Sequence, residues 1–233
     1  MLTKDSNLWV REGFMANGIY RITEEFEREL SKYTGAPHVI TVDSQSNALY
    51  LCLLYENVKG KKITIPNRTY PSVPCEILRA GGYVNWRAVE GSTLKGEYNL
   101  EGTRIWDSAL RFTSNMFRSG QLQCISFTGP YKILKLSKGG AILTDDYHAA
   151  LWFKKARFSG RNECSYHTDY FTTIGMNCYL MPELATRGLL LMGNFYDLQG
   201  NPKENKDIEV PYPDLSQFPI YNMSPEDNIW GIK

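Results

Sequence analysis

A hydroxyl-rich turn, Ser44-Gln45-Ser46, separates the apolar run 38–43 from a segment with helical apolar spacing at 47–55. The free N–H groups of a first helical turn and the helix dipole both favour a bound anion such as phosphate. The alternative is that Ser44 or Ser46 is only the N-cap of the helix. Taken alone, this segment favours the N-cap.

An acidic and a basic residue follow two further apolar runs. Asp107 ends the run RIWD, where a buried carboxylate is costly unless it is paired. Its partner could be the protonated ring nitrogen of a cofactor, an arginine, or the start of a helix. Lys132 follows the run 121–127, and a lysine in an apolar pocket loses basicity and can form a Schiff base with an aldehyde. Lys135 and Lys138 are similar neighbours, and residue type alone does not rank the three.

The elements that must position these residues alternate along the chain. The expected strands are 38–43, 61–67, 83–89, 103–107, 121–127 and 141–146, and the expected helices are 47–55, 71–80, 145–156 and 182–195. This order predicts an α/β fold with a mostly parallel sheet flanked by helices on both faces. The strand at 141–144 should run antiparallel after the Gly139-Gly140 reversal. Ligands of such sheets bind at the carboxyl ends of the strands, where the Ser44–Ser46 turn, Asp107 and Ser126 fall.

Composition narrows the function classes. The 233 residues carry a net charge of +1, so no electrostatic argument favours a nucleic-acid or membrane partner. No apolar stretch approaches 18 residues. The five cysteines are odd in number and lack CxxC spacing, which favours a reducing, cytoplasmic setting. The three histidines are not spaced as metal ligands, so no metal is expected.

Five segments, in the right order, resemble the DegT/DnrJ/StrS sugar aminotransferases between about Gly18 and Gly188. The segments are EEFERELSKYTGAPHVITVDSQSNALYLCLLY (24–55), KKITIPNRTYPSVPCEILRAGGYVNW (61–86), IWDSA (105–109), SFTGPYKILKLSKGGAILTDD (126–146) and GMNCYLMPELATRG (175–188). The resemblance implies the large domain of a fold type I transferase that uses pyridoxal 5'-phosphate (PLP). Residues 1–195 would form this PLP-binding domain, and 196–233 an extended arm that is the remnant of a small domain.

The resemblance also implies roles for individual residues. Lys132 would be the catalytic lysine, and Asp107 would bind the ring nitrogen of PLP. The other cofactor-binding residues would be Tyr70 against the ring, Ser44, Gln45, Ser46 and Ser126 at the phosphate, and Asn177 at the phosphate of the other subunit. The implied protein is a homodimer with shared active sites, which passes an amino group from a glutamate-type donor to a keto-sugar linked to a nucleotide.

Several positions depart from the family pattern. Gln45-Ser46 stands where the family has Gly-Thr, and Gln45 is expected to need a backbone conformation that glycine adopts more easily. Leu110 replaces a Gln or His, and most of the C-terminal small domain is missing. These departures favour an alternative, a degenerate, non-catalytic PLP-binding homologue or dimer partner. A second alternative, an unrelated α/β nucleotide-binding enzyme, lacks support from any GxGxxG or Walker motif.

Overall fold

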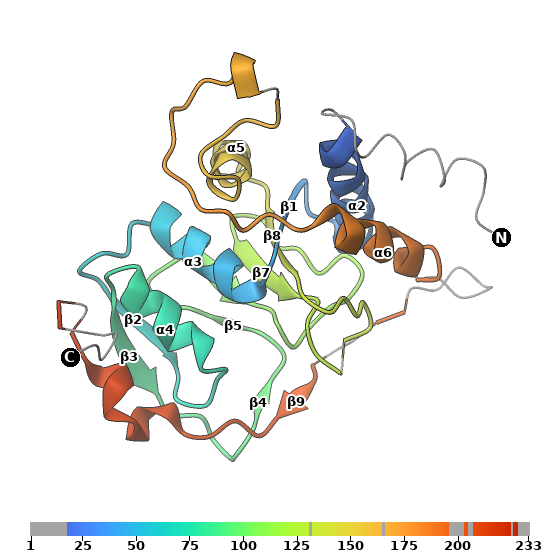
Figure 1. Ribbon diagram of the computed structural model, residues 1–233. Coiled ribbons are helices and arrows are strands. Elements are labelled where there is room, and N and C mark those ends of the chain that lie inside the picture. The colour runs from blue at the N-terminus through green and yellow to red at the C-terminus, as the bar shows by residue number, and fades with distance from the viewer. Residues whose placement is uncertain are drawn as a thin grey trace.

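A computed structural model describes residues 18–130, 132–164, 166–195, 203–204, 207–224 and 226–227. Helices lie on both faces of a central β-sheet (Figure 1). Among the described residues, no helix is long and apolar enough to cross a membrane. Residues 196–202 lie outside the described part, so the predicted domain boundary at 195 stays a prediction.

The central sheet has five strands in the order β1-β8-β7-β6-β5. Their bounds are β1 His38–Val42, β5 Tyr98–Asn99, β6 Ile105–Asp107, β7 Leu122–Ser126 and β8 Gly140–Thr144. β6 and β7 are parallel, whereas β8 runs antiparallel to both β1 and β7. The predicted antiparallel strand is thus confirmed, and β1, β6 and β7 all end at the same edge of the sheet.

A second parallel pair, β2 (Lys62–Pro66) and β3 (Tyr83–Arg87), lies beside this sheet. Thr64 of β2 forms an antiparallel bridge with Glu101, just after β5, and this bridge joins the two sheets. The two sheets together therefore contain both parallel and antiparallel strand pairs. Sequence reasoning missed the short strands β4 (Leu94–Lys95), β5 and β9 (Glu209–Val210), because two residues carry no readable alternation.

Within the described residues, five α-helices cover the sheet. They are α2 Gly18–Thr34, α3 Gln45–Tyr55, α4 Ser72–Arg79, α5 Tyr147–Ala156 and α6 Pro182–Met192. Ile22, Phe26, Leu30 and Tyr33 repeat at helical spacing along α2 and are all buried. Asp146 caps α5 by accepting a hydrogen bond from the N–H of Ala149 at 3.0 Å.

Alternating strand residues divide the core in two. Ile40, Cys124 and Ile142 point into a cluster with α3, α4 and α5, whereas Ile125 and Leu143 point into one with α2 and α6. Figure 1 shows α2 and α6 packed side by side, away from α3 and α4. Strands that are apolar on both faces require helices on both faces, which confirms the predicted fold class.

The described part of the C-terminal segment packs against the core. β9 pairs antiparallel with β4, and Leu215 is buried within a 3₁₀ turn, Leu215–Gln217. A second 3₁₀ helix follows at Pro219–Asn222. Here the chain is extended, as its composition predicts, but it is fixed by the backbone bonds of Ile208 to Leu110 and of Leu215 to Asn67.

Candidate functional site

A cavity of about 420 Å³ opens at the sheet edge where β1 and β7 end. This volume is in the range of small-molecule and cofactor sites. Six of the predicted site residues line it: Ser44, Gln45, Ser46, Tyr70, Ser126 and Lys132. The β1–α3 turn, the β2–α4 loop and the β7–β8 loop are therefore brought to one place, although they are far apart in the sequence.

Lys132 lies in the loop between β7 and β8, which is held in position by its neighbours. Leu134 and Leu136 are buried in the core beside α2, and the N–H of Leu136 bonds to the carbonyl of Phe127 at 3.0 Å. Burial lowers the pKa of the Lys132 amine to about 8, and the negative charge of Asp107 opposes this change. Lys135, in contrast, is exposed. Lys138 also lines the cavity, but it is exposed and forms an ion pair with Asp43 at 3.4 Å, so Lys132 is the most buried of the three lysines.

Asp107 lies behind the cavity and does not line it. Its Oδ1 accepts hydrogen bonds from the Gln45 amide and from the N–H of Ala109, both at 2.9 Å. Its Oδ2 accepts one from the Tyr98 hydroxyl at 2.9 Å. Burial raises the pKa of the Asp107 carboxyl, while these donors and the Lys132 charge oppose the rise. The two predicted charged groups are close enough to shift each other's pKa.

Gln45 does not adopt the glycine-like backbone expected from the sequence. It is the first residue of α3, and the non-glycine residues with positive φ in the described part are Asn57, Asn115, Ser159 and Asp207. That expectation was wrong because Ser44 caps the helix with an extended backbone, so Gln45 takes ordinary helical geometry. The Gln45 side chain instead fills the space between the cavity and Asp107.

The start of α3 offers hydrogen-bond donors to the cavity. Within the described residues, the N–H groups of Gln45 and Ser46 make no hydrogen bond, as the first turn of a helix leaves them free. The Ser44 hydroxyl is already engaged, since it donates to Asp43 at 3.0 Å and accepts from Asn47 at 3.2 Å. Ser44 is therefore an N-cap, and the turn also has two N–H groups that could bind an anion, so the phosphate site stays a prediction.

Residues of the C-terminal segment also line the cavity, although no pattern in the sequence indicated them. They are Ile208, Val210 and Tyr212. The Tyr212 ring makes an edge contact with that of Tyr70, with centroids 6.2 Å apart, and the Arg68 guanidinium donates to the Tyr212 carbonyl at 2.9 Å. Burial, with smaller contributions from Asp107 and Tyr70, raises the pKa of the Tyr212 hydroxyl to about 12.

Asn177 lies apart from this cavity. It is exposed, and its backbone bridges to Phe158. Its predicted role is toward the phosphate of another subunit, so a position away from the cavity of its own chain is compatible with that prediction, which stays untested.

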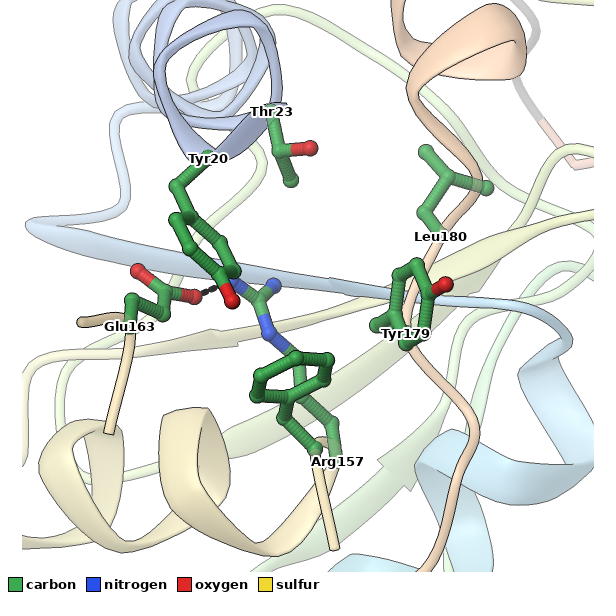
Figure 2. A pocket seen from close by; sticks show the side chains of 7 residues that line it. Tyr20, Thr23, Arg157, Glu163, Tyr179 and Leu180 are labelled. Carbon is green, nitrogen blue, oxygen red and sulfur yellow. Dashed lines mark hydrogen bonds and ion pairs between the residues drawn. The ribbon is translucent and has the colours of Figure 1, made fainter. Parts of the chain in front are cut away.

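A second cavity of about 90 Å³ lies between α2 and the end of α5, beside Arg157 (Figure 2). Arg157 is buried, and its guanidinium donates to Glu27, to Glu163 at 2.5 Å and to the Thr41 carbonyl at 2.8 Å. Although burial alone disfavours its charge, the two glutamates raise the pKa of Arg157 above its usual value. Arg157 is therefore a buried, paired residue that joins α2, β1 and the segment after α5.

The residues fit a PLP molecule at two of its four polar groups, which are the aldehyde, the phenolic oxygen, the ring nitrogen and the phosphate. The half-buried amine of Lys132 suits the aldehyde, and the free N–H groups of α3 suit the phosphate. At the ring nitrogen the fit is less direct. The Gln45 amide lies between the cavity and Asp107, so Asp107 does not face the cavity itself. Among the described residues, no cluster of three or more His, Cys, Asp or Glu side chains could hold a metal ion.

The fold is that of the large domain of fold type I, PLP-dependent transferases. The resemblance to one family within that class is also confirmed, since the sequence model of the DegT/DnrJ/EryC1/StrS aminotransferase family matches residues 4–95. A search of curated proteins finds no significant match.

Solved structures agree with this class. The chain is similar to a DegT/DnrJ/EryC1/StrS aminotransferase from Brucella abortus (TM-score 0.63, 19% identity, 81% of this chain and 63% of that one). It is also similar to a sugar aminotransferase from Micromonospora echinospora (TM-score 0.65, 16% identity, 83% of this chain and 66% of that one). A third match is a Streptococcus pneumoniae protein assigned as a sugar aminotransferase, in its PLP form (TM-score 0.60, 18% identity, 83% of this chain and 64% of that one). The matched region spans under two thirds of each relative.

Proposed function

We propose that this chain binds PLP through Lys132 and acts as a sugar aminotransferase. One observation carries the proposal: a half-buried lysine with a pKa lowered to about 8 shares a cavity with the amino end of α3 and is electrostatically coupled to Asp107. The family match and the PLP form of the pneumococcal relative support the choice of cofactor.

Each side chain at the cavity has a distinct task in this proposal. When bound, PLP supplies an electron-withdrawing ring that stabilises negative charge on the carbon of the amino donor. Near neutral pH the Lys132 amine can both hold and release a proton at Nζ, because its pKa lies close to that pH. The N–H groups of Gln45 and Ser46 bind the phosphate. Val210 and Tyr212 exclude water from one wall.

Reduction with borohydride tests the lysine assignment. Added PLP should give the visible absorbance of a cofactor bound through its aldehyde, and reduction should fix it to the peptide that contains Lys132. Lys132→Ala should abolish the fixed adduct. Lys135→Ala, an exposed lysine three residues along the same loop, should retain it. An adduct that persists in Lys132→Ala would falsify the assignment.

The substrates follow by analogy with the family. We propose a keto-sugar linked to a nucleotide as acceptor and a glutamate-type amino acid as donor, in a cytoplasmic homodimer. Glutamate should convert the bound cofactor to its amine form, and a panel of nucleotide-linked keto-sugars should reverse that change. If no amino acid and no keto-sugar changes the spectrum of the bound cofactor, transfer is ruled out while cofactor binding stands.

A second candidate function is that of a PLP-binding homologue without turnover. The contact between Gln45 and Asp107 favours it, because the carboxylate expected at the ring nitrogen is turned toward an amide. Single-turnover conversion with glutamate separates the two candidates, since only the catalytic one completes it.

A further inference from the structure

Gln45 separates the cavity from the buried carboxylate of Asp107. Its side chain is almost fully buried, lines the cavity, and donates a hydrogen bond from Nε2 to Asp107 Oδ1 at 2.9 Å. Asp107 contributes no atom to the cavity wall. A molecule in the cavity therefore meets the Gln45 amide before it can reach the carboxylate.

Asp107 has little remaining capacity to accept a further hydrogen bond. A carboxylate offers about four lone-pair directions, and three are used, by Gln45, by the N–H of Ala109 and by the hydroxyl of Tyr98. Tyr98 is buried and is held in place by Thr69, whose side-chain oxygen lies 2.6 Å from the tyrosine oxygen. The carboxylate is thus fixed by two groups that cannot easily move and by one, Gln45, that faces the cavity.

The Gln45 amide has unused hydrogen-bonding groups. Within the part of the chain that the structure describes, its carbonyl oxygen and its second amide hydrogen make no hydrogen bond. The carbonyl oxygen is not a buried unsatisfied atom, so it remains accessible. An amide in this position can accept from a protonated ring nitrogen or donate to an unprotonated one.

We propose that Gln45 is the residue that contacts the cofactor's ring nitrogen, and that Asp107 acts through Gln45 as a positioning residue. This inference rests on the proposed function. A neutral amide stabilises a cationic ring nitrogen less than a carboxylate does, because charge-assisted hydrogen bonds are about twice as strong as neutral ones. The bound ring nitrogen should therefore be less readily protonated than one that touches the carboxylate directly.

NMR of the full chain loaded with ¹⁵N-labelled PLP measures this protonation. In the wild-type protein the ring-nitrogen signal should be that of an unprotonated, hydrogen-bonded nitrogen at neutral pH. Gln45→Ala opens Asp107 to the cavity, so the ring-nitrogen pKa should rise by about 1–3 units. Gln45→Leu keeps the volume but removes the amide, so the nitrogen should stay unprotonated.

The control is Gln217→Ala, an exposed glutamine that does not line the cavity, and it should leave the signal unchanged. Thermal unfolding checks that each variant is folded. A wild-type ring nitrogen that is already protonated, and stays so in Gln45→Leu, overturns the inference but leaves the proposed function intact. If the wild-type protein gives no bound-cofactor signal at all, the proposed function fails and the inference fails with it.

Discussion

At the residue scale, the site depends on contacts between side chains that are distant in the sequence. The hydrogen bond from Gln45 to Asp107 joins residues 62 positions apart. Sequence reasoning identified both residues, with Gln45 at the phosphate and Asp107 at the ring nitrogen, but it did not predict their contact with each other. Residue types indicated an acid and a lysine near one ligand. They could not indicate that Gln45, and not Asp107, faces the cavity.

The lowered pKa of Lys132 predicts a pH-dependent stability of the cofactor-free protein. Because the folded pKa of about 8 lies below the usual value of 10.5, the unfolded chain binds more protons between these values. Stability should therefore rise with pH from about 8 to about 10.5. At pH 7, Lys132→Met should be more stable than wild type by on the order of 1 kcal/mol.

Melting temperatures at pH 7 and pH 10 check this prediction. The advantage of Lys132→Met should shrink at the higher pH, where the wild-type amine is neutral in the folded state. Lys135→Met, at an exposed position of the same loop, should have no pH-dependent advantage. An equal advantage of Lys132→Met at both pH values would contradict the burial of a charged amine.

The buried ion pair of Arg157 with Glu27 should be essential for stability. Arg157→Met leaves the buried Glu27 carboxylate without its cation, which should lower the free energy of unfolding by about 3–5 kcal/mol. Urea denaturation measures the loss. Arg104→Met removes an exposed ion pair with Glu56 and should cost less than about 1 kcal/mol. If both variants lost similar amounts of unfolding free energy, burial would not be the reason that the Arg157 ion pair stabilises the protein.

At the element scale, long periodic segments were predictable and short ones were not. The structure contains the expected helix at 47–55 as α3, two residues longer at its amino end because Ser44 provides the cap. β5 and β9, of two residues each, exist only through pairing with β6 and β4. A strand of that length has no local pattern, since its neighbours determine it.

Packing of α6 on α2 should depend on Gly188. A methyl group at this position would lie 2.5 Å from the Phe26 ring, which is too close for an unstrained contact. Gly188→Ala should therefore lower the free energy of unfolding by about 1–3 kcal/mol in denaturant titrations. Gly193→Ala, at the end of the same helix, meets nothing closer than 3.4 Å and should be near neutral. Equal effects would exclude close packing as the cause.

At the scale of the whole molecule, the C-terminal segment completes the cavity. Ile208, Val210 and Tyr212 form one wall, although their part of the sequence reads as an arm without periodicity. Their position depends on the backbone hydrogen bond from Ile208 to Leu110 and on the hydrogen bond from the Arg68 guanidinium to the Tyr212 carbonyl, which no local pattern encodes. The segment predicted to be the remnant of a lost domain therefore belongs to the site.

Mixing two inactive variants tests the proposed shared active sites. If Asn177 reaches the cofactor phosphate of a partner subunit, Lys132→Ala and Asn177→Ala should each weaken PLP binding, by roughly tenfold or more for the lysine variant, in line with one lost strong contact. An equimolar mixture in which subunits exchange freely should recover about a quarter of the sites, because about half of the dimers are mixed and each mixed dimer has one intact site, as measured by cofactor absorbance. Absence of recovery despite exchange would indicate that each chain builds its site alone.

The sequence by itself determined the α/β class, the antiparallel strand after Gly139-Gly140, and the position of the Ser44–Ser46 turn, Asp107 and Ser126 at the carboxyl ends of strands. These follow from periodicity and from the direction of the strands, which are local properties. Only the tertiary structure decided that Lys132 is the half-buried lysine, that Gln45 covers Asp107, and that Tyr212 closes the cavity. Burial and hydrogen-bond partners depend on residues far along the chain, so they become fixed only when the chain has folded.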